Sequence, residues 1–187
     1  RGEQVRAETV RALEAQRAGR FAAEIVPVPV LQGKGEPVMI AVDEEPGKVM
    51  FDKIPKLRPA FDKEGTITAA NASKIDDGAA AVVVMAAEKA AALGLAPVAR
   101  IVAQASFAQA PADFPTAPAS AIRKALAKAG LGLGDIDLFE INEAFAAVAL
   151  VALKELDLDP ERLNVHGGAI ALGHPIGASG ARILVTL

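Results

Sequence analysis

The sequence predicts an α/β fold in which helices cover both faces of a largely buried sheet. In residues 97–187, short apolar segments typical of strands alternate with helical stretches, and the connections between them are short. Residues 79–85 are apolar on both faces of the strand that they predict, so this strand must be buried on both sides. The hydrophobic content of 52% indicates that part of the surface also faces other protein.

The N-terminal part of the chain predicts one helix and one hairpin. Residues 1–18 form an amphipathic helical pattern that ends at Gly19, a residue type favoured just beyond the last helical turn. Residues 24–30 alternate in polarity but contain two prolines, which restrict them to an edge strand or an extended segment. Glycines in the segment 33–35 turn the chain toward a second strand at residues 38–42.

The remaining elements alternate between strand and helix. The predicted strands lie at residues 79–85, 98–103, 136–141 and 163–165, and the predicted helices at residues 88–93, 119–129, 143–156 and 178–187. Gly94 and Gly130 stand where two of these helices end.

His174 lies in a glycine-rich stretch, residues 164–182, between the last strand and the last helix. Five glycines surround this histidine, and Pro175 restricts its backbone to extended geometry. A strand-to-helix turn of this kind presents the imidazole beside free backbone N–H groups. Taken by itself, such a histidine is more often a hydrogen-bonded structural residue than a catalytic one.

Three motifs favour a catalytic role for this histidine over a structural one. The stretch 168–182 resembles the histidine motif of the thiolases, the acetyl-CoA acetyltransferases and 3-ketoacyl-CoA thiolases. Asn-Glu-Ala-Phe at 142–145 resembles their second motif, and residues 61–73 with 77–81 resemble a third. The three motifs stand in the family's order, and the resemblance covers nearly the whole chain.

The resemblance implies the layered αβαβα thiolase fold. Residues 1–75 then form part of the loop, or excursion, domain that lies over the active site. Residues 76–96 complete the N-terminal half of the fold, and residues 97–187 form a truncated C-terminal half.

The resemblance also implies an acyltransferase that catalyses the reversible condensation of two acetyl-CoA molecules to acetoacetyl-CoA and coenzyme A. His174 is then the base for a reactive cysteine, and the Asn142 amide holds a water that, with His174, forms a hole for the thioester oxyanion. From its place between strand and helix, Asn142 could instead be a helix N-cap. Glu143 is expected to brace the start of that helix.

The implied contacts for coenzyme A are Ser73, Ala69 and Phe145 along the pantetheine arm, with Lys53 and Lys48 at the phosphates. The two lysines belong to a basic cluster whose plainer interpretation is a solvated surface. Coenzyme A esters are substrates, so we expect no bound cofactor and no metal.

Composition excludes several other classes of protein. A net charge of −3 without a basic or aromatic series argues against a nucleic-acid partner. No apolar run approaches the ~20 residues of a membrane span, and we expect a cytoplasmic homo-oligomer, a dimer or tetramer, in fatty acid metabolism. The chain has no cysteine. Because thiolases use two, we expect a piece of a longer protein that is inactive alone.

Two alternatives remain open at this point. The segment that contains Phe107 and Phe114 resembles that of acetoacetyl-CoA thiolases and favours short acyl chains. A degradative 3-ketoacyl-CoA thiolase, however, has the same motifs. A cysteine-free thiolase-like chain could also bind coenzyme A esters without turning them over.

Overall fold

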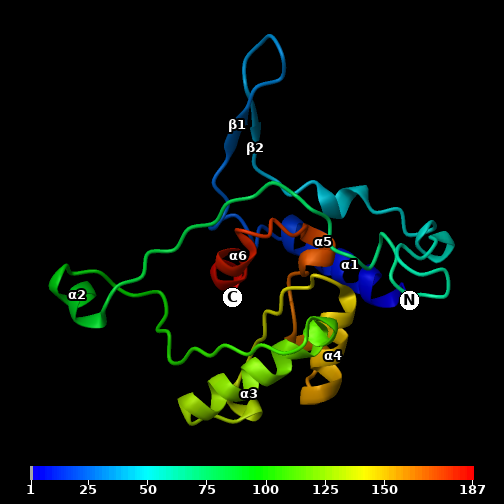
Figure 1. Cartoon of the computed structure of the whole chain (residues 1–187). Helices are drawn as coiled ribbons and strands as arrows, with labels where there is room; N and C mark the ends of the chain where they lie inside the picture. The colour runs from blue at the N-terminus through cyan, green and yellow to red at the C-terminus, as the bar shows by residue number, and fades with distance from the viewer. Residues whose placement is uncertain (1) are drawn as a thin grey trace.

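The computed structural model describes residues 2–187 as a mixture of helices, one small sheet and long extended segments (Figure 1). The α-helices are α1 Glu3–Arg17, α2 Ala87–Ala92, α3 Ala117–Ala129, α4 Ala146–Leu156, α5 Ala169–Leu172 and α6 Ser179–Thr186. The strands are β1 Val28–Val30 and β2 Val38–Ile40, and the 3-10 helices are η1 Glu45–Lys48, η2 Ile54–Lys56, η3 Pro111–Thr116, η4 Leu133–Asp135 and η5 Pro160–Arg162.

The helices predicted in residues 1–18, 88–93 and 119–129 are confirmed to within two residues. The glycine after each one adopts a positive φ, +67° at Gly19, +67° at Gly94 and +71° at Gly130, which is the left-handed conformation that ends a helix. α1 buries one face against α5 and η1.

The predicted hairpin is also confirmed. β1 and β2 pair antiparallel, with Val28 opposite Ile40 and Val30 opposite Val38. The hairpin projects away from the helices in Figure 1, and its apolar residues are largely exposed. The excursion-domain boundary at residue 75 stays a prediction.

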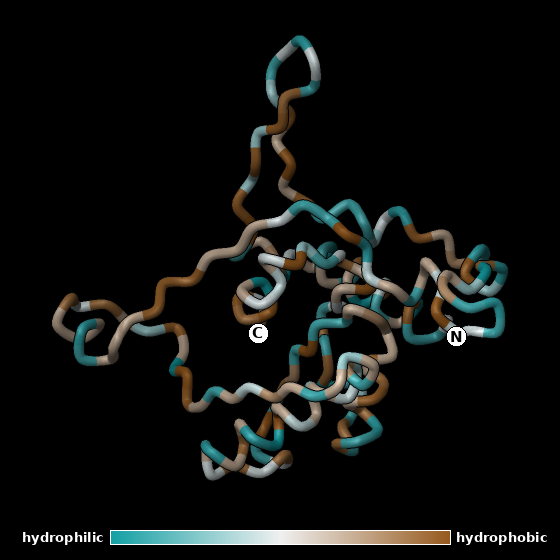
Figure 2. Tube along the Cα trace, viewed as in Figure 1, coloured by the Kyte–Doolittle hydropathy of each residue, from teal (hydrophilic) through white to brown (hydrophobic). Residues whose placement is uncertain are grey.

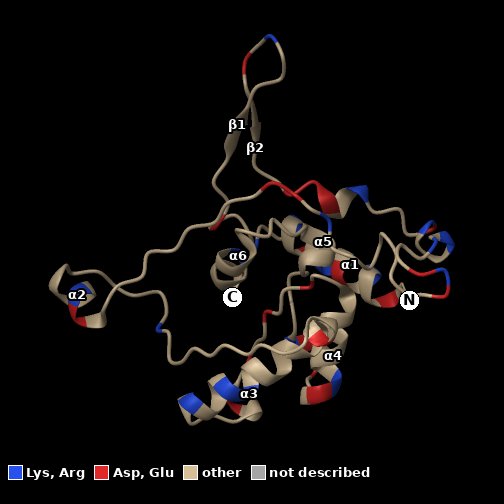
Figure 3. Cartoon of the chain, viewed as in Figure 1, with Lys and Arg blue, Asp and Glu red and all other residues tan. Residues whose placement is uncertain are grey.

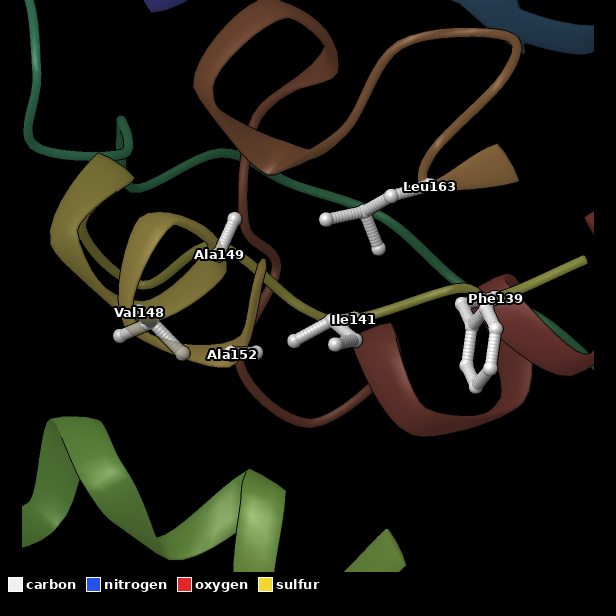
Figure 4. Packing of buried hydrophobic residues seen from close by; sticks show 6 residues of the cluster. All are labelled: Phe139, Ile141, Val148, Ala149, Ala152 and Leu163. Carbon is white, nitrogen blue, oxygen red and sulfur yellow. The ribbon is translucent and has the colours of Figure 1, made fainter. Parts of the chain in front are cut away.

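A small core forms where α4 packs on two extended segments that pair with each other (Figure 4). Its buried residues are Phe139, Ile141, Val148, Ala149, Ala152 and Leu163. Phe139 and Leu163 form a parallel bridge, in which Phe139 N donates to Arg162 O at 2.8 Å and Asn164 N donates to Phe139 O at 2.9 Å. This bridge is all that the structure retains of the strands predicted at residues 136–141 and 163–165.

The prediction of buried strands at residues 79–85 and 98–103 is wrong for the described residues. Both segments are extended, but neither pairs with another segment of residues 2–187, and Val83 is 88% and Val98 105% exposed. Figures 1 and 2 show them as apolar arms that carry α2 away from the other helices. The physical reason is that a strand becomes part of a sheet only through hydrogen-bonded neighbours, which local apolar character does not supply.

Candidate active site

The two residues expected to carry the chemistry meet in space although they are 32 positions apart. Asn142 follows the extended segment that ends at Ile141, and His174 lies in the connection between α5 and α6. Asn142 Nδ2 is 3.3 Å from His174 Nε2, and both side chains are half-buried. Asn142 Oδ1 is buried and has no hydrogen-bond partner among the described residues. The amide therefore faces the imidazole instead of the backbone.

The interpretation of Asn142 as a helix N-cap is wrong. α4 begins at Ala146, and its N-cap is Phe145, without a side-chain capping bond. The helix starts three residues later than predicted because residues 144–146 instead pair with the segment at residues 71–73, through Ala146 N to Asn71 O at 2.9 Å and through the bridge described below. Asn142 is thus left free for another role.

Asn164 fixes the backbone immediately before Asn142. Its side chain is fully buried and brackets Ile141: Asn164 Oδ1 accepts a bond from Ile141 N at 2.9 Å, and Asn164 Nδ2 donates to Ile141 O at 3.0 Å. This pair of bonds imitates one step of a sheet ladder where the backbone pairing has ended. Sequence reasoning did not assign Asn164 a role.

The backbone at His174 is fixed by contacts with the segment that contains Lys74 and Asp76. His174 N donates to Lys74 O at 2.9 Å, and Gly173 adopts a φ of +92°. A Cβ on Gly173 would overlap the Asp76 carboxylate, so only glycine fits this close approach. The predicted strand-to-helix turn is corrected in one respect, because the short helix α5 stands between the strand position and His174.

Two of the predicted coenzyme A contacts adjoin this pair. Ala72 and Phe145 form an antiparallel bridge, and Ser73 donates to Ala144 O from both its backbone N, at 3.1 Å, and its Oγ, at 2.9 Å. The Phe145 ring packs near the rings of Phe61 and Phe114, with centroid distances of 6.3 and 6.0 Å. The three rings therefore form an aromatic cluster around Phe145, three positions after Asn142.

The predicted lysines make no side-chain contact with Asn142 or His174 among the described residues, although Lys48 lines a cavity together with Gly173 and Pro175, the neighbours of His174. Lys48 Nζ binds Glu44 at 3.2 Å and Glu45 at 2.7 Å within and beside η1, so its charge is already paired. Figure 3 shows acidic and basic residues adjoining one another in the segment that follows β2. Lys53 and Ala69 are exposed, and the described residues give neither a side-chain contact to His174 or Asn142. The role of these residues in binding coenzyme A stays a prediction.

Two buried carboxyl groups hold the glycine-rich turn that leads to His174. Glu8 Oε2 accepts a bond from Gly168 N at 2.6 Å, and Glu143 Oε2 accepts one from Ile170 N at 3.3 Å. Both side chains are fully buried. The expectation that Glu143 braces the start of α4 is therefore wrong, because it braces α5.

Burial raises the pKa of both acids. The pKa of Glu143 rises to about 8 through burial and the nearby charge of Glu8. The pKa of Glu8 rises to about 7 through burial, against the opposing effects of the Gly168 N–H and Arg11. Arg11 Nη1 lies 3.6 Å from Glu8 and Gln4 Nε2 also donates to Glu8, so Glu143 is the acid that holds the proton at neutral pH.

We expect Glu143→Gln, which mimics the protonated acid, to reduce the pH dependence of stability. The folded protein keeps a proton on Glu143 between the ordinary pKa of 4.5 and about 8, where the unfolded chain has released it. The free energy of unfolding should therefore fall as pH rises through this window, by roughly 1.4 kcal/mol per pKa unit at most. Urea unfolding at pH 5 and pH 8 measures the change. The exposed Glu64→Gln is the matched control, and an unchanged slope in Glu143→Gln would contradict the assignment.

Among residues 2–187, no group of three or more histidine, aspartate or glutamate side chains is placed to hold a metal ion. No helix in the same range combines the length and the apolar character that crossing a membrane requires.

Two family models together match nearly the whole chain. The family model described as "Thiolase, N-terminal domain" matches residues 7–88, and the one described as "Thiolase, C-terminal domain" matches residues 95–187. The chain is 58% identical over 178 residues to the probable acetyl-CoA acetyltransferase of Dictyostelium discoideum, which is 95% of this chain and 43% of that protein.

Solved structures of similar proteins superpose on nearly the whole chain. The acetyl-CoA acetyltransferase of Bacillus anthracis superposes with a TM-score of 0.95 at 45% identity, over 99% of this chain and 47% of that one. The human mitochondrial 3-ketoacyl-CoA thiolase superposes with a TM-score of 0.87 at 38% identity, over 98% of this chain and 46% of that one. The chain spans less than half the length of these proteins, and the superpositions confirm the fold class predicted from the sequence.

Proposed function

Because the chain belongs to the thiolase family, we propose that it supplies the histidine and the asparagine of an acyl-CoA acyltransferase. The proposed reaction of the whole protein is the reversible condensation of two acetyl-CoA molecules to acetoacetyl-CoA and coenzyme A. The approach of the Asn142 amide to His174 Nε2, at 3.3 Å, is the observation that carries the proposal. The names of two of the matched proteins favour acetyl groups as the transferred unit.

In this reaction His174 Nε2 takes the proton of a cysteine thiol, which breaks the S–H bond and leaves a thiolate. The thiolate attacks the thioester carbonyl of acetyl-CoA, and Asn142 together with the imidazolium stabilises the oxyanion. The imidazolium then returns its proton to the departing coenzyme A thiolate. A second acetyl-CoA then loses an α-proton to the thiolate of another cysteine. Its carbanion attacks the acyl group, which breaks the acyl–sulfur bond and releases the first cysteine as a thiolate.

Both thiols have to come from outside residues 1–187, because the chain contains no cysteine. We therefore propose that the chain is inactive by itself. Ser73, Ala69 and Phe145 would line the path of the pantetheine arm, and Lys53 and Lys48 would meet the phosphates after Lys48 exchanges its present carboxylate partners.

We expect the whole protein to cleave acetoacetyl-CoA more efficiently than a ten-carbon 3-ketoacyl-CoA. The rings of Phe61 and Phe114 lie 6.3 and 6.0 Å from the Phe145 ring, and we propose that this aromatic cluster limits the length of the acyl chain. Steady-state thiolysis should give a kcat/KM roughly tenfold or more in favour of the short substrate. Phe114→Ala should reduce this preference, while Leu93→Ala, an exposed position beside α2, serves as the control. Equal efficiency on both substrates would favour a degradative 3-ketoacyl-CoA thiolase instead.

The second candidate function is binding of coenzyme A esters without turnover, and the absence of cysteine is the observation that favours it. An intact mass of the natural polypeptide tests it directly. A mass of ~19 kDa, that of the 187 residues alone, would support the binding function. A mass of ~40 kDa, as expected if the chain spans 43–47% of the whole protein as it does of its relatives, would support the enzyme.

We further propose that the whole protein is a cytoplasmic homo-oligomer, a dimer or tetramer, that acts in fatty acid metabolism. The exposed apolar residues of β1, β2 and the arms around α2 support association with other protein. Light scattering would measure the oligomeric state. Cell fractionation would test the compartment. One of the matched proteins is named as a mitochondrial enzyme.

A further inference from the structure

Ser179, the first residue of α6, makes the closest side-chain contact of His174. Ser179 Oγ lies 2.6 Å from His174 Nδ1 and 3.1 Å from Pro175 O. The serine is 4% exposed, so water does not compete freely for these bonds. The contact joins the first turn of α6 to the ring nitrogen that faces away from Asn142.

The partners of the two contacts determine which way each bond runs. Pro175 O only accepts, so the Ser179 hydroxyl donates its proton there and accepts a bond from Nδ1–H. On the other side of the ring, the Asn142 Nδ2 amide only donates, so Nε2 must present its lone pair. Both contacts are satisfied by one neutral tautomer, with the hydrogen on Nδ1.

We propose that Ser179 is a positioning residue that holds His174 in the Nδ1–H tautomer and so keeps on Nε2 the lone pair that accepts a proton. This inference rests on the acyl-transfer role proposed for His174, because only there is the Nε2 lone pair required. In water, a neutral histidine ring favours the opposite tautomer, with hydrogen on Nε2. A group that reverses this preference therefore matters for a base that acts through Nε2.

The same bond persists through the proton transfer. When Nε2 takes the thiol proton, the S–H bond breaks, an N–H bond forms, and the ring becomes an imidazolium. Nδ1–H still donates to Ser179 Oγ in that state, so neither the ring nor the hydroxyl has to reorient. Because a hydroxyl carries no charge, it holds the ring without adding an ion pair that would trap the proton.

The plainer role for Ser179 is to close the first turn of α6, since its backbone N also donates to Pro175 O at 2.9 Å. A purely structural role would leave the tautomer unchanged when the hydroxyl is removed. Ser179→Ala removes the hydroxyl and keeps the backbone bond. Ser179→Thr keeps both.

The test is a ¹⁵N NMR measurement of the His174 ring in the whole protein at alkaline pH, without substrate. His174→Asn assigns the signals, and His166, whose ring packs on Phe21 at 6.0 Å, is an internal reference. In the unmodified protein we expect the Nδ1–H form to dominate. In Ser179→Ala the tautomer ratio should move roughly five- to tenfold toward Nε2–H, as expected for one lost hydrogen bond.

A second readout is the single-turnover release of coenzyme A from acetyl-CoA. We expect a fall of roughly tenfold in Ser179→Ala, as expected for one lost hydrogen bond, and recovery of rate and tautomer together in Ser179→Thr. An unchanged tautomer ratio in Ser179→Ala, or a dominant Nε2–H form in the unmodified protein, would overturn the inference. If the unmodified protein releases no coenzyme A, the proposed function fails, whereas the NMR result still decides the role of Ser179.

Discussion

Replacing His174 by alanine in the whole protein is expected to lower the rate of acylation by roughly a thousandfold or more, because one side chain serves as base and as oxyanion donor. Both roles act through Nε2, the atom that lies 3.3 Å from the Asn142 amide. The measurement is single-turnover release of coenzyme A from acetyl-CoA. Turnover close to normal would exclude His174 from the chemistry.

The other histidine of the chain provides the matched control. His166 belongs to the same glycine-rich stretch, but its ring packs edge-on against Phe21 and makes no contact with Asn142 in the described residues. His166→Gln should therefore retain most of the acylation rate. His174→Ala should also unfold at nearly the same urea concentration as the unmodified protein, because its half-buried ring gives up few contacts.

Local signals predicted the elements whose stability depends on nearby residues. α1 and α3 follow from helical periodicity and a glycine after each helix, and the β1–β2 hairpin follows from alternation and a glycine turn. The strands failed because their stability comes from neighbours distant in sequence. Residues 79–85 and 98–103 have strong strand character, but no described segment pairs with either.

The candidate site, like the fold, could be predicted only in part from the sequence. The motif resemblance brought Asn142 and His174 together correctly in space, while composition alone would have left one as an N-cap and the other as a structural histidine. Lys48 was named as a phosphate contact from the family resemblance, and in the structure it pairs with Glu44 and Glu45 in and beside η1. A lysine with acidic neighbours at i−3 and i−4 carries a sequence signal for that pairing, which the basic cluster obscured.

Asn164 and Ser179 could not have been found by composition or spacing. Small polar residues are common in turns and at helix starts. Nothing in the sequence around Asn164 indicates that it binds the Ile141 backbone, and nothing around Ser179 indicates that it contacts His174 Nδ1. Each acts on a residue of another element or of the preceding turn. Only the folded chain shows which atom each one meets.

The last expected result separates the roles of Asn142, which is half-buried in the site, and Asn164, which is fully buried behind it. Asn142→Ala should lower acylation by roughly a hundred- to a thousandfold, the effect of removing one oxyanion-hole donor. It should leave the free energy of unfolding nearly unchanged, because Asn142 does not cap α4 and its Oδ1 has no partner among residues 2–187. The sequence interpretation as an N-cap instead predicts a loss of ~1 kcal/mol in stability.

Asn164→Ala is the comparison, because it removes two buried bonds to Ile141. It should destabilise the protein by about 1–3 kcal/mol, since the Ile141 N–H and C=O would be left buried without partners. Urea unfolding and single-turnover acylation, measured on both variants, distinguish the roles. If Asn142→Ala lost stability as Asn164→Ala does while keeping a normal rate, Asn142 would be a structural residue and the oxyanion assignment would be wrong.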